Sequence, residues 1–316
     1  MKGMPALQGC VLAALLLAAG AARAQVEFDV PFVPTPQSVV DAMLQIAAVK
    51  KDDVLFDLGS GDGRIVITAA KKFGTRGFGI DNDPVNVANA RANADAAGVK
   101  ERVTFSVGNL FTTDLSKASV VTLYLLQEAN LQLRPSLFRQ LKPGSRVVSH
   151  DFDMGDWPPD GRITLAVPDK PYGPLTSTVL FWVMPENAAG RWQWKLRVAG
   201  GNRDFEVAID QHFQQIELKP LVAGGPAKVL LPKLRYDQIS FTLVRDFGLP
   251  QEVHFEFSGR VRGDVISGRV RIIGERATGS RFESWEAQRV QKGEIRVSAA
   301  GAGALARLSV IEGEGQ

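Results

Sequence analysis

Hydrophobic positions along the chain follow two different periodicities, one before and one after about residue 185. Before it, short continuous apolar runs alternate with segments whose apolar residues recur every three or four positions, as expected when buried strands alternate with amphipathic helices. After it, apolar and polar residues alternate in short runs separated by glycine-containing turns, with no helical pattern between them. The pattern predicts an α/β doubly wound, Rossmann-like domain over residues 25–185 and an all-β sandwich or small barrel over residues 186–316.

The first part begins with an expected helix over 37–49, which places Val40, Met43, Leu44 and Ala47 on one side. Its entry, Thr35-Pro36, predicts Thr35 as the N-cap and proline at the first helical position. Strands and helices then alternate, and the part closes with two strands joined by a turn rich in proline and glycine. The strands expected after the one beginning at Val54 are 77–80, 102–107, 118–124, 145–149, 162–167 and 177–184.

The second part is expected to contain at least six strands. Trp192, Trp194 and Trp285 are predicted to fill its core, and His212 and His254, which stand alone on strand-like segments, are interpreted as structural. Binding of an envelope partner is the function that this β-rich part suggests. The expected strands are 192–198, 205–209, 214–218, 239–244, 253–257 and 265–273.

The N-terminus has the pattern of a secretory signal peptide. Lys2 gives a basic start, residues 11–19 form an apolar core, and Ala22-Arg23-Ala24 matches a small-x-small cleavage site. We expect residues 1–24 to be removed and the protein to be exported, to the periplasm, without a stable membrane span. The alternative is an uncleaved N-terminal membrane anchor.

Composition excludes several classes of function. The 316-residue chain carries 37 basic and 34 acidic residues, and the resulting formal charge of +3 indicates no nucleic-acid partner and no attraction to an anionic membrane. Cleavage would remove Cys10, the one cysteine, and with it any disulfide or thiol chemistry. No metal site is predicted, since the histidine and aspartates around residue 150 are too closely spaced to define ligand geometry.

The stretch from Val54 to Ile67 carries the strongest chemical signal. A buried strand ends at an acidic residue, a glycine follows at every second position, and a helical pattern begins at once. Such a turn lies at the carboxyl end of a strand, where doubly wound domains bind ligands. A dinucleotide fingerprint would need a glycine at Arg64, and no Gly-Lys-Ser/Thr of a P-loop follows.

The run Asp57-Leu58-Gly59-Ser60-Gly61-Asp62-Gly63 resembles motif I of the class I S-adenosylmethionine-dependent methyltransferases. The resemblance implies that this turn passes close to the methionine part of S-adenosyl-L-methionine. The alternative is a plain tight turn between strand and helix. The residues that the resemblance assigns to the cofactor are Asp57, Gly59, Ser60, Gly61 and Gly63.

Further cofactor contacts are expected at the ends of the next two strands. Asp81 follows the second strand at the spacing at which nucleotide-binding folds place a ribose carboxylate, although it could instead cap the next helix. Asn82, beside it, is a second candidate. After the third strand, Asn109 stands where the family commonly has an aspartate for the adenine amino group, and its amide oxygen can still accept that bond. Leu110 completes the set.

Four residues are candidates for the methyl-transfer site. Tyr124 ends the fourth strand, where this fold presents catalytic groups, but could equally be a core residue. His150, Asp151 and Asp153 form the densest titratable group of the chain, and a histidine flanked by carboxylates suits a general base. The alternative is a loop whose polar groups hold its own backbone.

Three sequence runs narrow the resemblance. Val33-Pro34-Thr35-Pro36, the run from Gly59 to Ile67, and Asp156-Trp157-Pro158-Pro159 look like a subgroup that includes exported bacterial methyltransferases of unassigned substrate and mitochondrial protein-lysine methyltransferases. The resemblance implies methylation of an acceptor, one possibility being a protein lysine. The alternative is an exported binding protein that kept the nucleotide fold and lost turnover, since S-adenosylmethionine is made in the cytoplasm.

Overall fold

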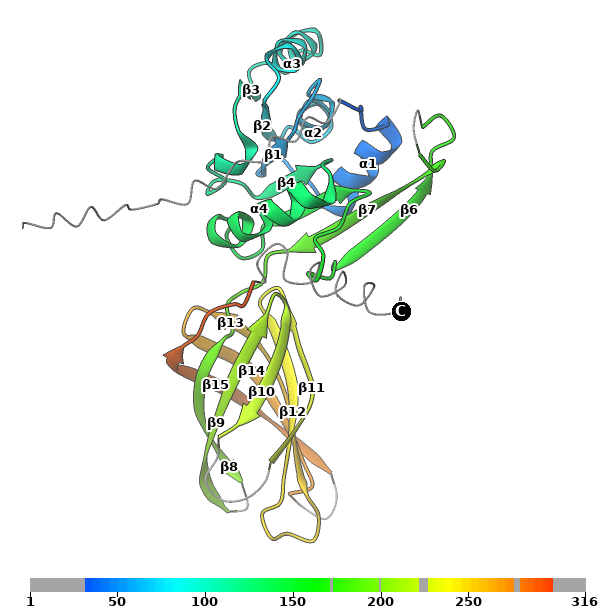
Figure 1. Cartoon of the computed structure of the whole chain (residues 1–316). Coiled ribbons are helices and arrows are strands. Elements are labelled where there is room, and N and C mark those ends of the chain that lie inside the picture. Colours follow the sequence, from blue (N-terminus) through cyan, green and yellow to red (C-terminus); the bar gives the residue numbers. More distant parts are fainter. Residues whose placement is uncertain (1–31, 171–172, 199, 222–226, 276–278, 298–316) are drawn as a thin grey trace, which may run out of the picture. The chain divides into compact units, whose positions relative to one another are not determined.

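The computed structural model describes residues 32–170, 173–198, 200–221, 227–275 and 279–297. The predicted signal peptide, residues 1–24, lies outside these ranges. Two separate β-sheets organise the described residues, one over the first part of the chain and one over the second (Figure 1). None of the described helices is both long and apolar enough to span a membrane.

The first sheet has seven strands in the order β3-β2-β1-β4-β5-β7-β6. The first five strands along the chain are parallel, whereas β7 runs antiparallel to β5 and β6 antiparallel to β7. The doubly wound sheet and its closing antiparallel hairpin are thus confirmed. The strands are β1 Val54–Leu58, β2 Arg76–Asp81, β3 Val103–Val107, β4 Val120–Leu123, β5 Arg146–His150, β6 Gly161–Ala166 and β7 Thr176–Val183.

The helices of this part are α1 Gln37–Ile46, α2 Arg64–Phe73, α3 Pro84–Ala96 and α4 Gln127–Gln140, with a short 3₁₀ helix η1 at Leu110–Thr112. The N-cap prediction for α1 is wrong. Pro36 occupies that position, and the hydroxyl of Thr35 turns toward His150 instead. The helix also ends before residue 49, because Ala48 adopts a left-handed conformation with φ 46°.

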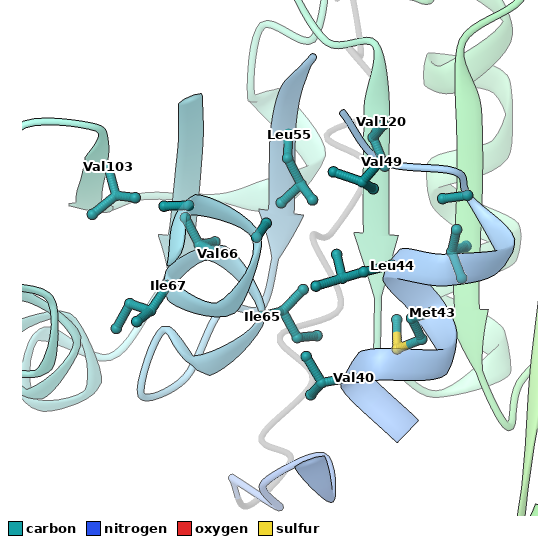
Figure 2. Close-up of a cluster of buried hydrophobic side chains, with 14 of the residues drawn as sticks. Val40, Met43, Leu44, Val49, Leu55, Ile65, Val66, Ile67, Val103 and Val120 are labelled. Carbon is teal, nitrogen blue, oxygen red and sulfur yellow. The ribbon is translucent and has the colours of Figure 1, made fainter. Parts of the chain in front are cut away.

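The apolar face of α1 packs as its periodicity predicts. Val40, Met43 and Leu44 are fully buried, and Figure 2 shows them beside Ile65 of α2 and Leu55 of β1. These side chains belong to one continuous apolar cluster that includes residues of the sheet. The cluster fixes α1 against α2 and the strands β5, β6 and β7, and with it the end of the segment 32–36 that precedes the helix.

The second sheet has eight antiparallel strands in the order β10-β9-β8-β15-β14-β13-β12-β11. Neighbours in this order are consecutive in sequence except β15 and β8. These two are the last and the first strand of this part along the chain, and they pair, so the sheet is a meander that curls toward a barrel. Of the two alternatives, the small barrel is correct. The strands are β8 Gly190–Val198, β9 Gly201–His212, β10 Gln215–Pro220, β11 Ala227–Arg235, β12 Gln238–Arg245, β13 Val253–Arg262, β14 Val265–Ile273 and β15 Ser280–Lys292.

Sequence periodicity missed β11 and β15. Most side chains of β11 are exposed, and Leu231 interrupts its ladder with φ 52° at a register shift, so no inward-facing alternation marks it. β15 buries only Trp285 and Ala287 among alternating charged and polar residues. The three tryptophans predicted as core are buried, with Trp192, Trp194 and Trp285 at most 5% exposed.

Candidate active site

The turn between β1 and α2 requires glycine for conformation and for space. Gly59, Gly61 and Gly63 all have positive φ, at 81°, 51° and 78°. A Cβ on Gly59 would lie 2.8 Å from the Leu125 side chain, and one on Gly61 would lie 1.9 Å from the ring of Phe32. The turn is therefore a tight one in which glycine makes room for Leu125 and Phe32, and its Gly59, Gly61 and Gly63 N–H groups all donate to acceptors within the protein.

Asp81 ties this turn to the end of β2. Its Oδ2 accepts the Gly61 N–H at 2.7 Å and its Oδ1 accepts the Asp83 N–H at 3.0 Å, and the residue is 6% exposed. The N-cap of α3 is Asp83, whose carboxylate accepts the Val85 N–H at 2.7 Å. Asp81 Oδ1 also accepts Asn86 Nδ2 at 3.3 Å, so Oδ2 is the oxygen that keeps capacity for a further donor, as a ribose carboxylate needs.

The carboxyl group of Asp57 has a pKa well above that of an ordinary aspartate. Its pKa is raised to about 7. Burial is the largest cause and the nearby Asp81 and Asp62 carboxylates add to it, whereas the Thr122 hydroxyl, which donates to Oδ1 at 2.7 Å, opposes the rise. A carboxyl group that changes its charge near neutral pH at the end of a central strand responds strongly to any charged ligand beside it.

The remaining cofactor candidates lie at the same edge of the sheet. The buried Ser60 hydroxyl has no hydrogen-bond partner among the described residues. Asn109, exposed beyond β3, caps η1 by accepting the Phe111 N–H at 2.8 Å, while Leu110 is half-buried and Asn82 is exposed. All three follow strands that end beside the glycine turn.

Tyr124 and His150 form the centre of the methyl-transfer candidates. Their rings stack with centroids 3.9 Å apart and an interplanar angle of 29°. His150 is fully buried, with Nε2 2.9 Å from the Ser177 hydroxyl and Nδ1 3.4 Å from the Thr35 hydroxyl. Burial lowers the pKa of His150 to about 4, so the imidazole is neutral at physiological pH. Tyr124 remains partly exposed.

The two aspartates point to different partners. Asp151, at φ 62°, accepts the Thr178 N–H at 2.7 Å and pairs with Lys170 Nζ at 2.6 Å. Its distance of 3.4 Å to His150 Nε2 is no ion pair at neutral pH, because the imidazole carries no charge. Asp153 accepts Gln127 Nε2 at 2.5 Å and the Gly155 N–H at 2.8 Å. Tyr124, His150 and Asp151 are thus in contact with one another through His150, whereas the Asp153 carboxylate bonds to Gln127 and Gly155.

Sequence reasoning missed Thr35, Ser177 and Lys170. The sequence around Thr35 predicted a helix cap and no contact with His150. The alternation of β7 did not distinguish Ser177 from other inward-facing residues. Within the ranges that the structure describes, no group of three His, Cys, Asp or Glu side chains could hold a metal ion.

Comparison with known proteins decides the family. A family model described as the ANTKMT methyltransferase domain matches residues 57–161. A protein-lysine N-methyltransferase of Saccharolobus islandicus is 44% identical over 159 residues, which make up 50% of this chain and 96% of that protein. The chain belongs to this family of class I S-adenosylmethionine-dependent methyltransferases. It is an S-adenosylmethionine-dependent enzyme, as motif I implied.

Two further matches each cover slightly less than half of this methyltransferase. The adenine nucleotide translocase lysine N-methyltransferase of Mus musculus is 33% identical over 147 residues, 46% of this chain and 63% of that protein. A crystal structure of an RNA methyltransferase from Salinibacter ruber with S-adenosyl-L-homocysteine is 55% identical, covering 49% of this chain and 95% of that chain at a TM-score of 0.44. These matches account for about half of the chain at most.

The site fits S-adenosylmethionine. The buried Ser60 hydroxyl has no partner among the described residues, and Asp81 Oδ2 can accept a further donor at the neighbouring strand end. When bound, the cofactor supplies a methyl group activated by the sulfonium. The chain's own task is to hold the two reactants in line and to exclude water.

We expect binding of S-adenosylhomocysteine to release a proton between pH 6 and 7. The free protein holds the Asp57 proton up to about pH 7, and a bound ammonium group near the carboxylate lowers that pKa. Affinity should therefore fall as pH falls below 7, by up to about tenfold per pH unit. Calorimetry in two buffers of different ionisation enthalpy measures the proton released.

Asp57→Asn is the control, because it removes the titrating group and should remove the proton release. Thr122→Val deletes the hydroxyl that donates to Asp57, which raises the pKa and should move the loss of affinity to higher pH. Proton release that persists in Asp57→Asn would assign the titration to another group.

Proposed function

We propose that this methyltransferase transfers a methyl group to the side-chain amine of a lysine in a protein. The supporting observation is the 44% identity that extends over 96% of the length of the Saccharolobus islandicus protein-lysine N-methyltransferase. The mouse relative, of which the alignment covers 63%, also carries lysine N-methyltransferase in its name.

Lysine methylation sets two requirements. The amine must lose its proton before it can attack, although the pKa of free lysine is about 10.4. A partly desolvated aromatic surface lowers that pKa, and a nearby acceptor can take the proton. Tyr124 offers a half-buried ring beside the carboxyl end of β4, and Asp153 offers a carboxylate close to the start of α4. These two groups are our candidates for receiving the lysine side chain and its proton.

A labelling experiment tests the acceptor. The chain, expressed from Gln25, is incubated with S-adenosylmethionine labelled in the methyl group and with proteins and RNA from cells that lack it. We expect label in protein, recovered after acid hydrolysis as methylated lysine. Asp81→Asn serves as the cofactor-site control. Label in RNA, or in protein on residues other than lysine, would overturn the proposal.

The place of this reaction is a second part of the proposal: the protein is exported and works in the periplasm. The basic start, apolar run and small-x-small site before Gln25 support it. Cell fractionation combined with N-terminal sequencing tests it, with a mature N-terminus at Gln25 expected in the periplasmic fraction. Recovery of the intact N-terminus in the cytoplasm or membrane would contradict export, the latter in favour of an anchor.

A further inference from the structure

Behind Tyr124 lies a polar arrangement built from three distant segments. Thr35 precedes α1, His150 ends β5 and Ser177 belongs to β7, yet their side chains meet. The two hydroxyl groups bracket the imidazole, one at each ring nitrogen, at 3.4 Å and 2.9 Å. All three residues are at most 4% exposed, so the hydrogen bonds are shielded from water.

This arrangement is unsuited to proton transfer with a substrate. Both ring nitrogens already face hydroxyl groups, and one face of the ring is covered by Tyr124. The charged groups near it, Asp151 and Lys170, pair with each other at 2.6 Å. A general base needs a free nitrogen within reach of the proton it removes, and this imidazole presents none.

The arrangement is suited to holding a ring in place. β4 ends at Leu123, so Tyr124 is the first residue without ladder hydrogen bonds, and its ring depends on side-chain contacts for its position. His150 supplies the stacked contact, while Phe152 is more distant, with ring centroids 6.5 Å apart. Hydrogen bonds at both nitrogens fix the imidazole against rotation about its own χ2.

We propose that His150 is a positioning residue, whose imidazole, anchored by Thr35 and Ser177, holds the ring of Tyr124 at the acceptor side of the active site. The inference rests on the proposed function for one element, the role of Tyr124 in receiving the acceptor amine. It replaces the general-base role that the sequence predicts for His150.

Thr35 also contacts the side chain of a residue that follows the glycine turn, which we call the cofactor turn. The Thr35 carbonyl accepts Arg64 Nη1 at 2.9 Å, and Arg64 pairs with Asp62 of the turn at 2.5 Å. The ring of Phe32, three residues before Thr35, packs on Gly61. The segment 32–36 therefore contacts both the cofactor turn and the imidazole that supports Tyr124, so an ordered cofactor turn favours an ordered acceptor side.

Steady-state kinetics separates positioning from base catalysis. His150→Phe keeps a flat ring against Tyr124, whereas His150→Ala removes the support. We expect His150→Ala to lower kcat by up to about 100-fold, the cost of a reacting group displaced by about 1 Å, and His150→Phe to lose much less. The acidic limb of the pH–rate profile should keep its shape in both. Equal losses in both variants, with that limb abolished, would establish a general base and overturn the proposal.

Thr35 provides a matched pair of variants. Thr35→Val keeps the shape and removes the hydroxyl, while Thr35→Ser keeps the hydroxyl. We expect Thr35→Val to lower kcat with little change in the affinity for S-adenosylhomocysteine, and Thr35→Ser to restore most of it. Retained affinity also shows that each variant is folded. Equal kcat in the two variants would remove Thr35 from the support of the ring.

A spectroscopic readout needs no acceptor. The chain has three tyrosines, Tyr124, Tyr172 and Tyr236, so 3-fluorotyrosine labelling gives three ¹⁹F resonances, and Tyr124→Phe assigns one. We expect the Tyr124 resonance to be shifted by the stacked imidazole, to lose that shift in His150→Ala and to broaden in Thr35→Val. An unchanged resonance in His150→Ala would overturn the proposal. Should the wild type methylate no lysine, the proposed function fails, and the resonance still decides the role of His150.

Discussion

Replacing Asp81 with asparagine is expected to weaken the binding of S-adenosylhomocysteine by roughly 10- to 100-fold, the difference between a charge-assisted and a neutral hydrogen bond in a buried site. Asp81 is 6% exposed, accepts two N–H donors at Oδ1 and one at Oδ2, and keeps a lone pair of Oδ2 for a hydroxyl donor. Asparagine has a single acceptor oxygen and presents N–H groups where a hydroxyl must donate. Isothermal titration calorimetry with the chain expressed from Gln25 measures the change.

Asp83→Asn is the matched control. It lies two residues further along, also carries a carboxylate, and caps α3 without facing the glycine turn. We expect its affinity to stay within about threefold of the wild type, since asparagine is as good an N-cap as aspartate. An equal loss in both variants would indicate that the start of α3 rearranges. Unchanged affinity in Asp81→Asn would exclude Asp81 from the cofactor site.

The doubly wound part of the fold could be predicted because its central strands are buried on both faces and therefore appear as continuous apolar runs. β11 and β15 gave no such signal. On a barrel one face of each strand is exposed. In β15 that face includes Phe282 and Val290, while the charged Arg281, Glu283 and Arg289 share the other face with Trp285 and Ala287. Where the inward-facing set is small, alternation along a single strand is too weak to recognise.

The cofactor side of the site was similarly accessible to sequence reasoning, since turn glycines and strand-end acids act through local geometry. The acceptor side was not. The contact between Thr35 and His150 joins residues 115 positions apart, and that between His150 and Ser177 spans 27. A threonine before a proline predicts a helix cap, yet Pro36 took the cap position and released the Thr35 hydroxyl to the imidazole. Tertiary packing determines that the Thr35 hydroxyl contacts His150 and does not cap the helix, and the spacing of residues in the sequence does not show this.

Replacing Trp194 with alanine is expected to lower the free energy of unfolding of the barrel by about 3–5 kcal/mol, the usual loss for a large aromatic side chain removed from a packed core. Trp194 is 5% exposed and packs against Phe205, Phe257 and Trp285, with ring centroids 5.2–5.7 Å away. Its buried indole N–H has no partner among the described residues, so the loss comes from packing alone. Chemical denaturation followed by tryptophan fluorescence measures it.

Phe282→Ala on β15 is the control, because that ring is 67% exposed and its removal should change stability by no more than about 0.5 kcal/mol. The same pair of variants tests whether the chain consists of two domains that meet near residue 185. The cofactor residues all precede that point, so under conditions where both variants remain folded we expect Trp194→Ala to bind S-adenosylhomocysteine as tightly as Phe282→Ala. Weaker binding in Trp194→Ala would mean that the barrel and the cofactor site fold as one cooperative unit, because loosening the barrel core would then loosen the glycine turn.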